Sequence, residues 1–202
     1  KEMINMGTMI EKSIGDAVKA LMKQDVELAQ KVMAGDEEID RTERKIEDLC
    51  LRLLLQQQPV ARDLRNISAA LKMVTDMERI GDHATDISEL AIVLSEKKYV
   101  KKLDHIEEMA RETMVMLIQS LEAYVEKDLD KAQKVIAHDD VIDDLFEEVK
   151  QELIELIRNH ADEGEQAVDL LMVTKYFERI GDHATNIAEW VEFALDDKVR
   201  KS

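Results

Sequence analysis

Carboxylates recur at intervals of three and four residues in two stretches of the chain. One stretch carries Glu78, Asp82, Asp86 and Glu89, and the other carries Asp36, Asp40, Glu43 and Glu47. Residues at this spacing share one face of an α-helix, because each residue advances about 100° around the axis. Like charges one turn apart destabilise an exposed helix by about 0.2–0.5 kcal/mol per pair. A helix face that stacks them in series therefore indicates a site for cations.

The ligand types narrow the chemistry of this site. Cys50 is the only cysteine, so a cluster of thiolate ligands is excluded. Carboxylate oxygens suit Mg²⁺, Mn²⁺ or iron, Zn²⁺ is also admissible, and bridging carboxylates allow a multinuclear site. The alternative is a solvated acidic face on a structural helical bundle that binds no metal.

The same pattern recurs in the second half, because the string ERIGDHAT occupies residues 78–85 and again 178–185. The predicted metal ligands of the first half are Asp36, Asp40, Glu78, Asp82 and Asp86, with Glu43 as a further candidate. Those of the second half are Asp139, Asp143, Glu178 and Asp182, with Glu147 and Asn186 as further candidates. Phe146 stands where the first half has Glu43, and an amide replaces Asp86. We therefore do not expect the two sites to be equivalent.

Three other residue types in the repeated string are expected to have structural roles. We expect the arginines at 79 and 179 to pair with neighbouring carboxylates, and the histidines at 83 and 183 to make structural hydrogen bonds. The glycines at 81 and 181 lower helix stability, which indicates close packing of two helices at these points.

The elements that position these side chains are predicted to be six helices in an all-α fold. Apolar residues at helical spacing begin at Met3 and at Ile106, and longer helices are expected over about residues 26–55, 60–94, 129–157 and 166–195. Few glycines, a single proline and 3% aromatic residues fit this class. The short connections predict two tandem three-helix bundles related by internal duplication, residues 1–97 and 103–202.

Composition limits the partners and the compartment. A net charge of −17 argues against nucleic-acid binding, which requires clustered basic residues. The sequence contains no apolar run of the roughly 18–20 residues that a transmembrane helix needs. The single cysteine is compatible with a cytoplasmic protein. Because the chain starts at Lys1, we also allow for a missing upstream segment.

Taken together, these motifs resemble the PhoU family of phosphate-uptake regulators. The resemblance is carried by the paired ERIGDHA strings, by the segment QPVARDLR at residues 58–65, and by DEEID at 36–40 and DDVID at 139–143. It extends over nearly the whole chain. It implies two tandem three-helix bundles with surface metal clusters held by E(D)xxxD motifs, and these motifs fall on the same carboxylates that helical spacing selects.

The resemblance further implies a regulatory protein without enzymatic activity. Members of the family are expected to be cytoplasmic, often homodimeric, and to couple a phosphate ABC transporter to a sensor histidine kinase as negative regulators of phosphate-starvation genes. Association with the membrane would then be peripheral and through these partners. A second alternative is a carboxylate-bridged di-iron oxidase of the ferritin-like kind. Such sites use Glu-x-x-His pairs in a bundle core, and no histidine here follows a glutamate at that spacing.

Overall fold

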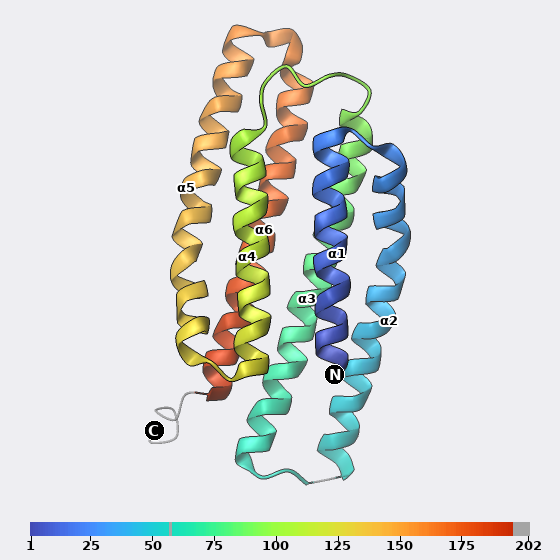
Figure 1. The fold of residues 1–202 in the computed structure, drawn as a ribbon, viewed down its shortest axis with the longest axis vertical. Coiled ribbons are helices and arrows are strands. Elements are labelled where there is room, and N and C mark those ends of the chain that lie inside the picture. The colour runs from blue at the N-terminus through green and yellow to red at the C-terminus, as the bar shows by residue number, and fades with distance from the viewer. Residues whose placement is uncertain (57, 196–202) are drawn as a thin grey trace.

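The computed structural model describes residues 1–56 and 58–195, and the chain in these ranges is a bundle of six long helices (Figure 1). The helices are α1 (Glu2–Lys23), α2 (Val26–Gln56), α3 (Ala61–Leu94), α4 (Asp104–Glu126), α5 (Leu129–Asn159) and α6 (Gly164–Leu195), with a short 3-10 turn at Ala161–Glu163 before α6. All six were predicted from helical spacing, and the all-α fold with two repeats of three helices is confirmed.

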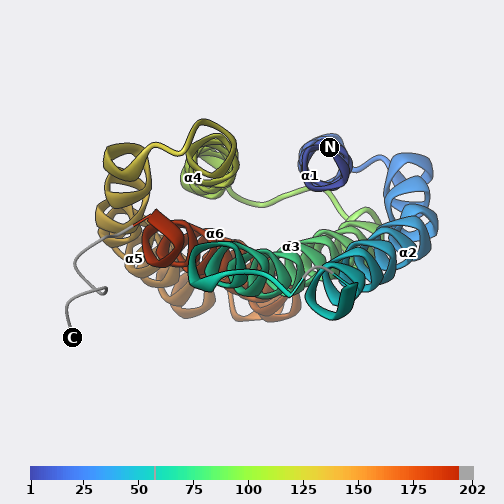
Figure 2. The same ribbon diagram turned by 90° about the horizontal axis from the view of Figure 1, so that it is seen from below.

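The helices form two layers (Figure 2). Helices α2, α3, α6 and α5 lie side by side in a curved layer, and α1 and α4 cover its concave face. Helix α1 packs on α2 and α3, and α4 packs in the same way on α5 and α6. Contact between α3 and α6 joins the two halves, so the helices that carry the repeated string are also the ones at the centre of the molecule.

The first helix of each half folds for the same reason. Helix α1 buries Met6, Ile10 and Ile14 along one stripe, and α4 buries Met109 and Leu117 at corresponding positions. Because such a stripe can leave water only against neighbouring helices, burial of these side chains fixes which faces of α1 and α4 contact the curved layer.

The turns after α1 and α4 are also copies of each other. Gln24 and Lys127 both adopt the left-handed conformation that ends a helix, with φ of 53° and 56°. In the following helices, the carboxylate of Asp25 accepts a hydrogen bond from the backbone N–H of Leu28 at 3.1 Å. Asp128 caps α5 in the same way through Lys131. The duplication therefore includes the local chemistry of the turns.

Helix α2 continues through Gly35, as predicted. The linker between the halves is tied to both of them. The Tyr99 hydroxyl donates to the carbonyl of Leu21 at 2.5 Å, and Gln166 bonds the backbone of Lys98 and Val100.

The domain limits 1–97 and 103–202 stay a prediction. Residues 196–202, at the end of the second domain, lie outside the described residues, as does Gln57.

Candidate metal centre

The predicted carboxylates of the first half converge between α2 and α3. One oxygen each from Asp36, Asp40 and Asp82 lies within 4.8 Å of the others, a spacing that one ion or a small cluster can bridge. The helices approach closely here because α3 has a glycine at this level. A Cβ built on Gly81 would lie 3.2 Å from Cδ1 of Ile39 and 3.8 Å from Oδ1 of Asp36. The glycine thus lets the two helices meet and leaves the space beside the Asp36 carboxylate open.

Two carboxylate oxygens of this trio have no hydrogen-bond partner. Oδ1 of Asp36 and Oδ1 of Asp40 are both buried, and neither accepts a hydrogen bond from the described part of the protein. An unpaired buried acceptor costs about 1–3 kcal/mol, and more when it is charged. A cation coordinated by these oxygens would remove this cost, so the residues fit a metal site.

Burial and mutual repulsion raise the pKa of the carboxylates around the trio. Burial, Asp82 and Asp40 raise the pKa of Asp36 to about 6. Burial and the charges of Glu47 and Asp40 raise the pKa of Glu43 to about 7. Burial and the hydrogen bond and charge of Asp82 raise the pKa of Glu78 to about 8. These groups therefore compete for protons at neutral pH, and a divalent cation would replace those protons.

Arg79 neutralises this charge only weakly. Its guanidinium nitrogens lie 4.0 Å from Glu78 and 3.9 Å from Asp82, and 62% of its side chain is exposed. An exposed pair at this distance contributes about 0–1 kcal/mol. The ion pairs expected for Arg79 are present, but they leave most of the acidic charge uncompensated. The same expectation for Arg179 was wrong, because among the described residues its guanidinium makes no ion pair and lies 5.8 Å from the ring centroid of Tyr176.

Asp86 lies on an open groove that connects the trio to the second half. The groove has a volume of about 530 Å³ and is lined by Asp36, Arg79, Asp82, His83, Thr85, Asp86, Arg179 and His183. Asp86 accepts a hydrogen bond from Nδ1 of His83 at 3.2 Å, as expected for a structural histidine. The rings of His83 and His183 stack with centroids 5.5 Å apart, so the two copies of the repeated string meet at this groove.

The second-half carboxylates are also close enough to repel one another. Burial and Asp139, with smaller effects from Glu178 and Asp143, raise the pKa of Asp182 to about 6. The pKa of Asp139 and that of Asp143 are raised as well, mainly by burial. In residues 1–56 and 58–195, however, these groups do not form a trio of ligand atoms like that of the first half.

Sequence differences between the halves explain why the second-half carboxylates do not form such a trio. Lys175 donates a hydrogen bond to Glu178 at 2.5 Å and lies 5.2 Å from the ring centroid of Phe146, so a side-chain cation already occupies part of this acidic face. The first half has Thr75 and Glu43 at the corresponding positions. Glu147 is exposed and lies 3.8 Å from Lys150.

Asn186, a further candidate ligand, takes part in the joint between the halves. Its amide donates to Oδ1 of Asp76 at 3.2 Å, and His183 Nδ1 bonds the same oxygen at 2.9 Å. Sequence reasoning missed Asp76 and Lys175. A signal existed, because the second half has Tyr176 in place of Asp76 and the first half has Thr75 in place of Lys175, at positions beside the duplicated string.

Comparison with known proteins decides the family. A PhoU domain matches residues 3–91 and again residues 106–191, which are the two halves of the fold. The chain belongs to the PhoU family. Its two PhoU domains correspond to α1–α3 and α4–α6, and the acidic trio lies on the first of them.

Relatives of this PhoU chain cover almost its whole length. The phosphate-specific transport system accessory protein PhoU homolog of Clostridium acetobutylicum is 40% identical over 98% of this chain and 90% of its own. The homolog of Aquifex aeolicus is 36% identical over 89% of this chain and 81% of its own. The names describe accessory proteins rather than enzymes, in agreement with the expectation of a non-enzymatic PhoU protein.

Solved PhoU structures share the fold. The crystal structure of PhoU from Pseudomonas aeruginosa superposes with a TM-score of 0.94 at 33% identity, covering 100% of this chain and 95% of that one. The PhoU regulatory protein of the phosphate transport system from Streptococcus pneumoniae gives a TM-score of 0.88 at 25% identity, over 96% and 91% of the two chains. None of the helices in the described ranges has an apolar stretch long enough to cross a bilayer.

Proposed function

We propose that this protein is an accessory regulator of phosphate-specific transport, and that a metal-bearing acidic face on its first half shapes the surface that its partners bind. The role in phosphate transport is supported by the names of relatives that match at 40% and 36% identity over most of the chain. The metal is supported by one observation above all, the buried and unpaired oxygens of Asp36 and Asp40 beside Asp82.

The metal would act as a structural cross-link. Asp36 and Asp40 come from α2 and Asp82 comes from α3, so an ion bound by all three fixes one helix against the other. The groove beside this cluster continues to Arg179 and His183 of the second half. Loss of the ion would leave several like charges unshielded between two helices, and repulsion would change the shape of the groove. The proposal thus links metal occupancy to the surface at which the halves meet.

The partners follow from the transport role and from charge. The chain is a negative regulator that couples a phosphate ABC transporter to a sensor histidine kinase, working as a cytoplasmic homodimer and reaching the membrane through these partners. A net charge of −17 favours basic surfaces on the partners. Iron, Mn²⁺, Mg²⁺ and Zn²⁺ are all compatible with carboxylate ligands, and neighbouring carboxylates allow more than one ion.

A binding experiment with matched variants tests this function. Wild-type protein is expected to retain the transporter ATPase and the kinase, and D36N/D82N is expected to lose most of this binding, as is wild-type protein treated with chelator. D139N/D182N makes the same chemical change at the weaker cluster and should bind nearly as wild type. If the wild type binds neither partner, the regulatory role is wrong. If D36N/D82N and chelated protein bind as well as wild type, the metal has no part in docking.

The di-iron oxidase is not supported by this site. Asp36 and Asp82 of the trio line an open groove on the surface rather than the core of a bundle, and the relatives are named as accessory proteins. The remaining alternative is a helical bundle that binds no metal. It predicts no anomalous peak between α2 and α3 in crystals grown with Mn²⁺.

A further inference from the structure

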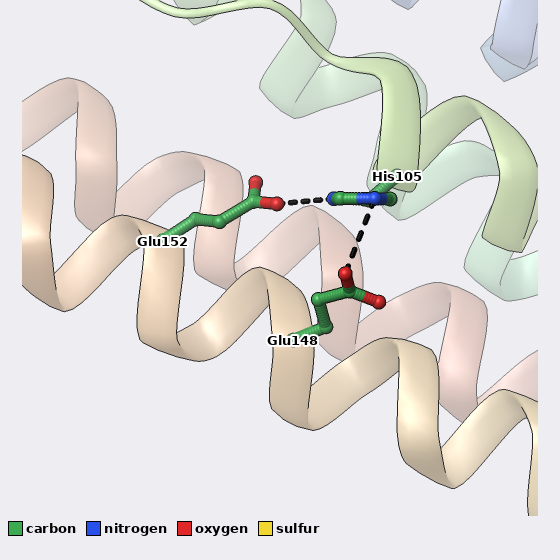
Figure 3. A group of neighbouring side chains, drawn as sticks. All are labelled: His105, Glu148 and Glu152. Atoms are coloured by element: carbon green, nitrogen blue, oxygen red, sulfur yellow. Dashed lines mark hydrogen bonds and ion pairs between the residues drawn. The ribbon is translucent and has the colours of Figure 1, made fainter.

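A second group of possible metal ligands lies far along the chain from the repeated string. His105, the second residue of α4, points between two glutamates of α5, Glu148 and Glu152, which are one helical turn apart (Figure 3). Nε2 of the imidazole lies 3.3 Å from Oε1 of Glu148, and Nδ1 hydrogen-bonds Glu152. One ligand atom from each residue lies within 4.8 Å of the others.

The first half has a simpler contact at the corresponding position between its first and second helices. At the corresponding positions it has Glu2, Lys45 and Leu49, and Lys45 Nζ pairs with Glu2 at 3.3 Å. In the first half a single ion pair thus links these two helices at this position. The second half reverses the polarity of this pair and adds Glu152 in place of a leucine. The added carboxylate contacts both Lys101 and His105.

The arrangement of the imidazole is that of a metal ligand. Histidines that bind a metal through one ring nitrogen commonly donate the other ring N–H to a carboxylate, which fixes the tautomer. Here Glu152 bonds Nδ1, and this leaves Nε2 directed at Glu148. With bonds of about 2.0–2.2 Å, two ligands of one zinc ion lie about 3.0–3.5 Å apart. The observed 3.3 Å between Nε2 and Oε1 requires no movement.

The local charge favours a divalent ion. Glu108, half-buried and one turn along α4 from His105, adds a third carboxylate whose charge acts on the imidazole. Lys101 pairs with Glu152 and supplies one compensating positive charge. With a neutral imidazole, three carboxylates and one lysine leave an excess of two negative charges.

We propose that Nε2 of His105 and the carboxylate of Glu148 bind a borderline divalent cation of the zinc type, and that Glu152 is the positioning residue that orients the imidazole. Imidazole nitrogen selects Zn²⁺ over Mg²⁺. The metal preference of this site therefore differs from that of the first-half trio, whose ligands are all oxygens. It does not depend on the proposed function, because it shares no residue with that trio.

Zinc binding is measured in a protein whose two predicted carboxylate clusters each lack two ligands through D36N/D82N/D139N/D182N. Equilibrium dialysis with Zn²⁺ should still load about one ion per chain. Adding H105Q or E148Q should weaken binding at least tenfold, and E152Q should weaken it about 10–100-fold, the usual effect of removing an orienting carboxylate. Adding E2Q, the matched change in the first half, should leave zinc binding unchanged.

The imidazole resonances give a readout that needs no substitution at the site. In ¹⁵N-correlated spectra, zinc should leave His105 protonated on Nδ1 and shift Nε2 to the value of a coordinated nitrogen. Two results overturn the proposal. One is undiminished zinc binding by H105Q. The other is an imidazole that keeps protons on both nitrogens at saturating zinc, which makes the cluster an ion pair only.

Discussion

Gly81 on α3 packs directly on Ile39 of α2, so closely that a Cβ at Gly81 would lie 3.2 Å from Cδ1 and 3.3 Å from Cγ2 of the isoleucine. Ile39 is only 3% exposed and has little room to move. This contact sets the distance between the two helices that carry Asp36 and Asp82. Helix packing and the geometry of the acidic trio are therefore determined at the same point.

The first prediction follows from this contact. G81A should lower the free energy of unfolding by about 1 kcal/mol, because overpacking by about 1–3 kcal/mol exceeds the gain in helix propensity of about 1 kcal/mol. It should also weaken metal binding, since the helices are pushed apart. Urea unfolding and metal titration measure the two effects.

Two other glycines serve as controls for that change. A Cβ at Gly35 would meet nothing within 4 Å, so G35A should stabilise the protein by about 0.5–1 kcal/mol. At Gly181 the nearest contact would be 3.4 Å from Ile142, which ordinary packing accommodates, so G181A should be tolerated. Equal destabilisation by all three substitutions would contradict the role assigned to Gly81.

The second prediction concerns pH. Asp36 and Glu78 have pKa values of about 6 and about 8 in the folded protein, above their ordinary values near 4. The folded state therefore holds protons that the unfolded chain has released, and the stability of the metal-free protein should fall as pH rises from about 4 to about 8. D36N/E78Q should show a smaller fall, measured as Tm against pH. An unchanged pH slope in this variant would show that these two carboxylates are not the source.

Bound metal should counteract this fall in stability with rising pH. Because the ion replaces bound protons, Mn²⁺ should raise Tm more at pH 8 than at pH 5. The same titration with D36N/E78Q should produce little change at either pH. A shift in Tm that is independent of pH would place the ion away from these protonated carboxylates.

The third prediction exchanges a charge between the halves. Lys175 pairs with Glu178, whereas the first half has Thr75 at the equivalent position. K175T should increase metal affinity at the second cluster, and T75K should decrease it at the first, each by about tenfold, since a neighbouring cation disfavours a second positive charge. Isothermal titration of both variants measures the change. A decrease in affinity with K175T, an increase with T75K, or no effect from either substitution would exclude Lys175 as the cause of the asymmetry.

The fourth prediction concerns the joint between the halves. The carboxylate of Asp76 receives hydrogen bonds from His183 and Asn186 and is 13% exposed. D76A should destabilise the protein by about 1–3 kcal/mol, because two half-buried donors lose their acceptor. T75A, at the neighbouring exposed position, should change stability by less than about 0.5 kcal/mol. Equal effects from both substitutions would mean that Asp76 does not hold the halves together.

The fold was largely predictable because it depends on local periodicity. The apolar spacing of α1, the break before Asp25 and the duplicated string were enough to place six helices and two repeats. The carboxylates of α2 and α3 could also be paired in advance, since short connections make neighbouring helices antiparallel. Their stripe was expected on the open surface, however, and Asp36 and Asp40 prove half-buried with one buried oxygen each.

The other contacts of the site depend on which helices pack together, and a single sequence does not specify this packing. The stacking of His83 on His183 requires α3 to pack on α6 across the two halves. The same crossing brings Asp76 to Asn186. The difference between Asp76 and Tyr176 marks the position in the sequence, but it does not name the partner. The His105 group was missed for a related reason, because its members are separated by the turn between α4 and α5 and lie outside the repeated string.

The central claim, that the first-half carboxylates hold a metal ion, is tested most directly by anomalous diffraction. Crystals grown with Mn²⁺ should give an anomalous peak at the manganese edge between α2 and α3, within about 2.0–2.4 Å of oxygens from Asp36, Asp40 and Asp82. The account predicts that D36N/D82N crystals lack this peak. A wild-type map with no peak there, and with the oxygens of Asp36 and Asp40 bonded to water instead, would contradict it.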